Sequence, residues 1–238
     1  MAKAHDTWTV LPHAPIERLS DHVWRVQGTL EHMDLRRVMT VAKRGDGGLV
    51  IHNGVCLDDA SMAAIDAWGP VRVILVPNAY HRLDAKVFKD RYPDAAVLCP
   101  AGARAKVAEV VAVDGAYEDF PADAAVSLET LAGIGEAEGV MIVREAAGVT
   151  LVFNDAIFNM PHTKGIAGLI FRYITASTGG PRISRLFRLF VLKDRAALRE
   201  HLLRLADLDG LRRVIVSHHR MVEGDGAAEA IRTAVSHL

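Results

Sequence analysis

The sequence predicts an α/β protein of four layers, in which two mixed β-sheets pack face to face and helices cover both outer faces. Three observations favour this αββα sandwich. The first quarter of the chain is rich in short β-runs with hairpin signals, the next part alternates strands with amphipathic helices, and the second half repeats that order. Because nothing in the 238 residues forces a split, we expect residues 1–238 to form a single domain.

The first quarter predicts antiparallel strands at 23–26, 37–41 and 48–52. Each is a short run rich in β-branched and other apolar residues. Gly45-Asp46-Gly47-Gly48, between the second and third runs, is typical of a hairpin turn. Asn53-Gly54 ends the third strand, since this pair favours a turn.

The next part predicts alternating helices and strands. Asp58 or Asp59 can cap a helix, and Gly69-Pro70 stops it. A buried strand at 71–76, a helix at 83–91 and a short strand at 96–98 follow.

The second half predicts the same succession. Strands are expected at 126–128, 140–143, 149–153 and 213–216, and helices at 195–205 and 227–237. Pro181 opens a further helix, 182–192, within a basic amphipathic segment that spans 172–192. Arg182, Arg185 and Arg188 share one face of that helix. This pattern suits a cover helix packed on the sheet, a homodimer contact, or a face for a membrane or an anionic ligand.

Composition excludes several classes of function. The formal net charge is −1, so no global field favours nucleic acid or an anionic membrane. No window approaches 18 uninterrupted apolar residues, so we expect no transmembrane segment. Cys56 and Cys99 are the only cysteines, and two cysteines this far apart in sequence favour a reducing cytoplasm over a disulfide framework.

Two histidines leave the sheet at the end of the last predicted strand. The run Val216-Ser217-His218-His219-Arg220 closes that strand. Because α/β proteins build ligand sites at the carboxyl ends of strands, we expect a small-molecule ligand or substrate there.

Four segments, taken in chain order, resemble motifs of the metallo-β-lactamase superfamily. Ile51-His52-Asn53-Gly54 stands where that family has an Ile-Asp-Thr-Gly-like turn, and residues 77–84 stand where it has Thr-His-x-His-x-Asp-His. Residues 152–158 match a strand that ends in Gly-Asp-x-hydrophobic-Phe, and 217–219 match the terminal Ser-His-Gly. The chain is thus similar to a divergent branch of that superfamily, which implies the αββα fold and a hydrolytic metal site.

The resemblance also implies a reduced set of metal ligands. Asn78, Tyr80, Arg82 and Leu83 stand where the motif has its first histidine, second histidine, aspartate and third histidine. The mid-chain histidine of the family has no counterpart near 135–139. Asp155 and His218 match in kind, and with His81 they form a two-histidine, one-carboxylate set that suits one zinc or iron ion.

The remaining candidates line the predicted pocket. They are Asn78, Tyr80, Arg82, Glu138 and His219. Glu138 is a candidate fourth ligand. Arg82 is expected either to repel a cation at the metal position or to pair with Asp155 and replace it.

Two functions follow from the resemblance, and the sequence assigns no catalytic residue. The first is a hydrolase that cleaves an ester, thioester or amide with one metal ion. The second is a metal-free, non-catalytic protein that binds a small molecule or a partner on the same fold. In that second case His218 would bond to a loop carbonyl, and Asp155 would cap the turn after its strand.

Overall fold

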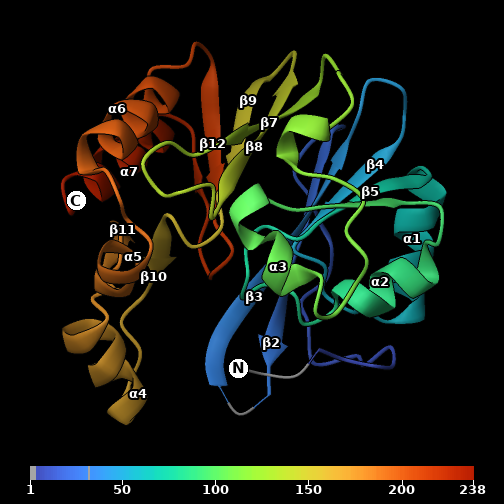
Figure 1. The fold of residues 1–238 in the computed structure, drawn as a ribbon, viewed down its shortest axis with the longest axis horizontal. Coiled ribbons are helices and arrows are strands. Elements are labelled where there is room, and N and C mark those ends of the chain that lie inside the picture. Colours follow the sequence, from blue (N-terminus) through green and yellow to red (C-terminus); the bar gives the residue numbers. More distant parts are fainter. Residues whose placement is uncertain (1–3, 32) are drawn as a thin grey trace.

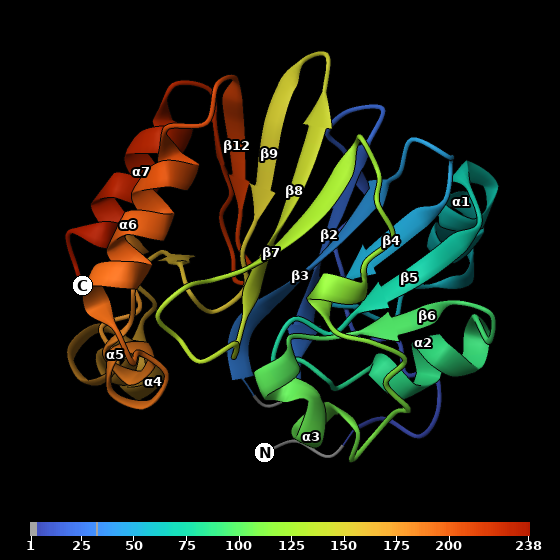
Figure 2. The ribbon, with the colours of Figure 1, turned by 45° about the horizontal axis from the view of Figure 1, so that its top comes forward.

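The computed structural model describes residues 4–31 and 33–238. Two β-sheets stand face to face, as Figures 1 and 2 show. Helices α1 (Asp59–Trp68) and α2 (Ala85–Arg91) lie outside the first sheet, and α6 (Arg195–Ala206) and α7 (Gly226–Val235) lie outside the second. The predicted αββα sandwich is therefore confirmed.

The first sheet has the strand order β1-β2-β3-β4-β5-β6. Its strands are β1 (Glu17–Arg18), β2 (Val23–Leu30), β3 (Met33–Lys43), β4 (Leu49–His52), β5 (Val71–Leu75) and β6 (Ala96–Leu98). Pairing is antiparallel from β1 to β4 and parallel from β4 to β6. The predicted strands of this half are present, and the hairpin of β2 and β3 extends further than predicted.

The second sheet has the strand order β13-β12-β9-β8-β7. Its strands are β7 (Val126–Thr130), β8 (Gly139–Glu145), β9 (Gly148–Val152), β12 (Leu211–Ile215) and β13 (Val222–Glu223). Only β9 and β12 pair in parallel. Each sheet thus contains parallel strands. The carboxyl ends of parallel neighbours lie at the same edge of their sheet, so the loops that follow them start there.

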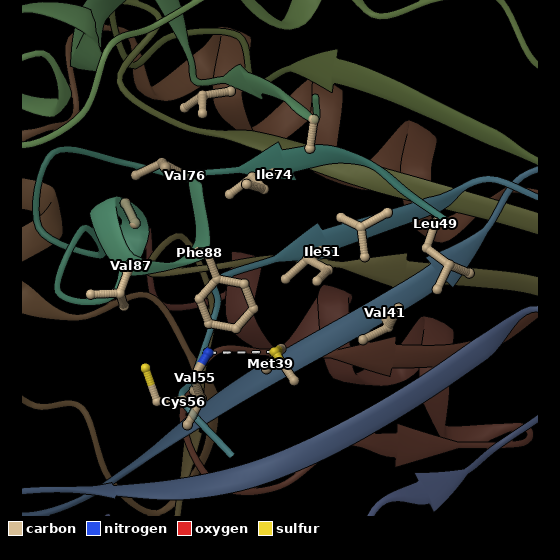
Figure 3. Packing of buried hydrophobic residues seen from close by; sticks show 14 of the residues in the cluster. Met39, Val41, Leu49, Ile51, Val55, Cys56, Ile74, Val76, Val87 and Phe88 are labelled. Carbon is tan, nitrogen blue, oxygen red and sulfur yellow. Dashed lines mark hydrogen bonds between the residues drawn. The ribbon is translucent and has the colours of Figure 1, made fainter. Parts of the chain in front are cut away.

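Buried apolar side chains form three clusters. One lies between the two sheets, and one lies between each sheet and the helices that cover it. The outer face of the first sheet packs on α1 and α2 through residues such as Met39, Ile51 and Phe88 (Figure 3). Another cluster, which includes Val50 and Ile215, fills the space between the sheets. A third lies between the second sheet and helices α6 and α7. This follows from the alternation of side chains along each strand.

Helix α1 shows how local sequence sets an element. Its N-cap is Asp58, whose side chain accepts a hydrogen bond from the Ser61 backbone N–H at 2.8 Å. The helix ends at Trp68, before Gly69-Pro70, and buries Met62 and Ile65. Both predicted ends are confirmed. The short elements that follow β6 were not predicted: η1 (Ala101–Ala103), α3 (Arg104–Val107) and η2 (Tyr117–Asp119).

The prediction of a helix over 182–192 is wrong at its start. Pro181 and Arg182 lie in strand β11 (Gly180–Arg182), which pairs with β10 (Phe158–Met160). Helix α5 (Arg185–Phe190) begins only after Ser184, whose side chain accepts from the Phe187 N–H. Proline is tolerated in β11 because this two-stranded sheet has only edge strands. Arg182 therefore does not share a helical face with the two arginines of α5.

An unpredicted helical turn precedes β11. It consists of α4 (Gly165–Leu169) and the π-helical segment η3 (Ile170–Ile174). Across the described part of the chain, none of the helices combines the length and apolar character needed to cross a membrane.

The turn after β4 is sterically tight, which yields a prediction. A Cβ atom on Gly54 would lie 2.8 Å from Cδ2 of the fully buried Phe88 ring. We expect Gly54→Ala to lower the free energy of unfolding by about 1–3 kcal/mol, because a packed core accommodates extra volume poorly. Chemical denaturation measures this loss. Phe88→Leu should relieve the overlap, so the double variant should lose less than the two single losses together. Strictly additive losses would contradict the contact.

Candidate metal site

Three loops meet at one edge of the sandwich. They follow β5, β9 and β12, and they carry His81, Asp155 and His218. One ligand atom from each side chain lies within 4.8 Å of the other two. Nε2 of His81 and Nε2 of His218 are each 3.2 Å from Oδ1 of Asp155. The structure therefore brings together the three residues that the sequence proposed as ligands.

Hydrogen bonds on the far side of each ring define which nitrogen faces the aspartate. Nδ1 of His218 donates to the Arg36 carbonyl oxygen at 2.8 Å. Nδ1 of His81 is 3.0 Å from Oδ1 of Asn53, whose Nδ2 donates to the Val38 carbonyl at 2.8 Å. This second bond assigns the Asn53 amide, so Nδ1 of His81 is also the donor. In the neutral rings, both Nε2 lone pairs therefore point at Oδ1 of Asp155.

The charges of the site follow from burial and proximity. Burial lowers the pKa of His81, although Asp155 opposes that change. Burial would raise the pKa of Asp155, but His81 and His218 outweigh it and hold this pKa well below its usual range. Near neutral pH the site presents an ionised carboxylate oxygen and an imidazole lone pair to one point. This donor set fits a divalent cation, and the bonds from Nδ1 are those that metal-binding histidines make.

Asn78 positions both the aspartate and His81. Its Nδ2 donates to Oδ2 of Asp155 at 2.8 Å. Its Oδ1 accepts from the backbone N–H groups of Tyr80 and His81, at 2.8 and 3.0 Å. Asn78, which stands in the place of the first motif histidine, thus supports the ligands from behind.

A buried ion pair fixes the loop that carries His81 to strand β3. Nη1 of Arg37 lies 2.8 Å from Oδ2 of Asp84, and both side chains are almost fully buried. Nη2 of Arg37 also donates to the Gly54 carbonyl at 2.7 Å. The loop after β5, the turn after β4 and strand β3 are therefore joined at one point.

Glu138, the candidate fourth ligand, lines the smaller cavity at Asp155, and its carboxylate is occupied by donors of the Asp155 turn. Its two carboxylate oxygens accept from the backbone N–H groups of Asn154, Asp155 and Ala156 and from Nδ2 of Asn78. Burial and the charge of Asp155 raise its pKa to about 8, against the opposing effect of these donors. Glu138 shapes the Asp155 turn and does not belong to the cluster of ligand atoms.

The expectation that Arg82 pairs with Asp155 is wrong. Its guanidinium donates to Oε2 of Glu109 at 2.8 Å and to the Lys106 carbonyl. It therefore leaves Asp155 free of an arginine partner. Arg82 is oriented by Glu109 and Lys106, which belong to the region of α3, an element that the sequence did not predict.

His219 and Tyr80 take different places. Nε2 of His219 accepts a long bond of 3.4 Å from the Arg36 N–H, and its carbonyl accepts from the Gln27 side chain. His219 is not among the described residues that line the two cavities at Asp155. Tyr80 lines both cavities and is 65% exposed.

An apolar cavity of about 360 Å³ opens beside Asp155. Its lining includes Leu35, Phe158, Met160, Phe171 and Phe187. The Phe158 ring stacks on His218, with the ring centroids 5.4 Å apart. The candidate metal site and the cavity are therefore contiguous.

Two residues of the site region were missed from the sequence. Asn53, which orients His81, was read only as a turn residue. His52 was named only as part of a family-like turn. It is fully buried at the end of β4, and both ring nitrogens lack a hydrogen-bond partner in the described residues. Thr40, which pairs with His52 from strand β3, has a hydroxyl that also lacks a partner in the described residues. A polar residue that ends a buried strand is the signal that could have identified both.

Comparison with solved structures decides the fold. A metallo-β-lactamase from Erythrobacter litoralis, with β-mercaptoethanol in its active site, aligns at a TM-score of 0.62 and 16% identity over 94% of this chain and 96% of that one. The mono-zinc form of the metallo-β-lactamase FIM-1 from Pseudomonas aeruginosa aligns at 0.58 and 14%, over 97% and 98%.

The metallo-β-lactamase DIM-1, exposed to ceftazidime, aligns at 0.64 and 9%, over 96% and 99%. The chain has the metallo-β-lactamase superfamily fold. The metallo-β-lactamase fold thus spans nearly the whole chain, as the four sequence segments implied. No protein-family model matches the chain, and no curated protein matches it in sequence.

The buried His52 predicts an acid-sensitive stability. Burial, helped by the charge of His81, lowers its pKa from 6.5 to about 3. The folded ring stays neutral while the unfolded ring binds a proton, so stability is lost as pH falls from 6.5 towards 3. The loss that this ring causes on going from neutral pH to about pH 5 should be roughly 2 kcal/mol.

We expect His52→Leu to remove the loss of stability that the His52 ring causes. Leucine suits this position because the residue paired with it on β5 is Leu75. Chemical denaturation of both proteins at the two pH values measures the difference between them. An identical pH dependence in the two proteins would show that His52 is not the group responsible.

Proposed function

We propose that the chain is a hydrolase that uses one metal ion to cleave an ester, a thioester or an amide. One observation carries the proposal: Nε2 of His81 and Nε2 of His218 both lie 3.2 Å from the same carboxylate oxygen of Asp155. In neutral rings whose Nδ1 atoms donate, both Nε2 atoms offer lone pairs to that point. Three hydrogen-bond acceptors at such distances repel one another unless a cation or a proton lies between them. Because the opposite nitrogen of each ring already donates, a bound cation satisfies all three together.

The residues of the chain have separable roles in this proposal. His81, Asp155 and His218 would hold one zinc or iron ion, and three protein ligands leave a coordination position for the reaction. When bound, the ion would supply a nucleophilic hydroxide near neutral pH and polarise the substrate carbonyl. Asn53 and the Arg36 carbonyl keep the rings in the binding tautomer, while Asn78 and Glu138 hold the Asp155 turn.

One ion, rather than two, fits the ligands that the chain offers. Asn78, Tyr80 and Leu83 stand where the superfamily motif has histidines, so the first histidine cluster is missing. Among solved structures of similar fold, FIM-1 has been crystallised in a mono-zinc form. The substrate would be a small molecule that enters the apolar cavity beside Asp155. We place this hydrolase in the cytoplasm, since Cys56 and Cys99 are both buried and unpaired.

A metal-free binding protein is the second candidate. The Asn78 amide already occupies Oδ2 of Asp155, which leaves Oδ1 for the histidines. Protons on the two Nε2 atoms would pair with Oδ1 and hold the pocket without an ion. The cavity would then bind its ligand without chemistry.

Metal content separates the two candidates. We expect protein purified without added metal to contain about one equivalent of zinc or iron, because the donor set holds one ion. His218→Ala removes a ligand and should lose this metal. His219→Asn changes the adjacent histidine and should keep it, since asparagine tolerates the positive φ of 64° at this position. Elemental analysis by mass spectrometry measures all three proteins.

Circular dichroism shows whether each variant is folded. If the wild-type protein holds no metal even after incubation with excess zinc, the hydrolase proposal is wrong and the metal-free protein is correct. Equal metal in wild type and His218→Ala would place the ion elsewhere.

A further inference from the structure

The segment after the metal site has an unusual distribution of charge. Residues 156–193 contain no acidic residue, although the whole chain has a net charge of −1. Its basic residues are Lys164, Arg172, Arg182, Arg185, Arg188 and Lys193. Asp155 and Asp194 bracket the segment. A chain that is almost neutral overall thus concentrates positive charge in one stretch.

The same stretch carries most of the large apolar side chains that are exposed in the described residues. Of the large apolar side chains that are exposed in the described residues, all except Val10 and Tyr80 lie between 166 and 190. They are Ile166, Leu169, Ile170, Tyr173, Ile174, Leu186, Leu189 and Phe190. The most exposed, Ile166, Leu189 and Phe190, are exposed by 79%, 74% and 72%. We call the surface formed by α4, η3 and α5 the α4–α5 face. These helices lie next to one another, with α5 beside the two-stranded sheet of β10 and β11 (Figure 1).

The α4–α5 face is continuous with the cavity beside the metal site. Leu186 and Phe190 are exposed on this face and also line the 360 Å³ cavity. Phe171, Phe187 and Asp155 line the same cavity. An apolar path therefore leads from the surface of α5 to the candidate ligands. Its volume lies within the range of small-molecule pockets.

Two kinds of occupant could cover an exposed apolar face, and charge distinguishes them. Arg172 and Arg185 are exposed on η3 and α5, so a twofold dimer through the α4–α5 face would bring the like charges of two copies together. An anionic lipid surface instead attracts basic residues while its acyl region accepts the apolar ones. The acid-free composition of the segment therefore favours a membrane over a second copy.

We propose that the α4–α5 face docks on an anionic lipid bilayer and that the cavity takes the acyl chain of a lipid ester or thioester to the metal site. The substrate part of this inference rests on the proposed hydrolase function. Hydrolysis breaks the bond between the acyl carbon and the leaving oxygen or sulfur. A water oxygen joins that carbon, and one water proton passes to the leaving group, so that an acid and an alcohol or thiol result.

Vesicle sedimentation tests the docking. We expect the wild-type protein to sediment with vesicles of equal parts phosphatidylcholine and phosphatidylglycerol. Binding to vesicles of phosphatidylcholine alone should be at least roughly tenfold weaker, because the attraction of the basic residues is lost. Leu189→Ser combined with Phe190→Ser should reduce binding to the anionic vesicles by a similar factor. Val10→Ser, a matched loss of an exposed apolar side chain outside the face, should leave it unchanged.

A second readout tests the cavity and is independent of the metal. A fluorescent fatty acid should bind to the wild-type protein with increased emission. Leu35→Trp, which fills the cavity from strand β3, should weaken this binding. Wild-type protein treated with a metal chelator should bind vesicles and fatty acid as the untreated protein does, so a failure of the hydrolase proposal would not by itself abolish either signal.

Three outcomes would overturn the docking. The first is no sedimentation with anionic vesicles. The second is equal binding by the Leu189→Ser/Phe190→Ser and Val10→Ser variants. The third is that the wild type binds no vesicle and is a dimer by light scattering, whereas the Leu189→Ser/Phe190→Ser variant is a monomer. In that case a second copy covers the face. Fatty-acid binding that Leu35→Trp does not change would overturn the role of the cavity.

Discussion

The buried carboxylate of Glu138 is the group on which the geometry of the site depends. It accepts three consecutive backbone N–H groups, from Asn154 to Ala156, at the point where β9 leaves the sheet. Without this acceptor, buried donors would remain unpaired, at a cost of about 1–3 kcal/mol each. The turn that results aims Oδ1 of Asp155 at the two histidines, and Asn78 holds the other oxygen. Glu138 contributes no atom to the cluster of candidate ligands, yet it determines where Oδ1 of Asp155 lies.

Hydrogen bonds and an ion pair behind the candidate ligands hold them in place, although this chain lacks the histidines of the superfamily motif. Histidines are missing from three motif positions, yet His81, from a position between them, enters the site. It does so because the Asx turn of Asn78 and the Arg37–Asp84 ion pair hold its loop. Its ring is then oriented by Asn53 from the end of a different strand. The site is smaller than the motif implies, and each of its three candidate ligand side chains has a hydrogen-bond partner behind it.

The parts of this fold that could be predicted are those that local pattern determines. The strands that form β4, β5, β9 and β12 are short apolar runs followed by turn residues, and helix α1 carries its own cap. The convergence of Asp155 and His218 required the chain order of the superfamily as well. By contrast, Pro181 lies in a strand because a distant segment, 158–160, pairs with it. Arg82 turns to Glu109, and Glu138 to backbone donors, since these partners become neighbours only in the tertiary structure.

The bond from His218 to the Arg36 carbonyl joins residues that are 182 positions apart. Strand β3 belongs to the first sheet, whereas His218 follows the last parallel strand of the second, so the ring is oriented only once both sheets have docked. Contacts of such long separation form slowly, because chain entropy is lost before they can stabilise anything. Assembly of the ligand cluster should therefore be a late event in folding. An ion bound by His81, Asp155 and His218 would link the two halves of the chain, and its binding would stabilise the folded protein against their separation.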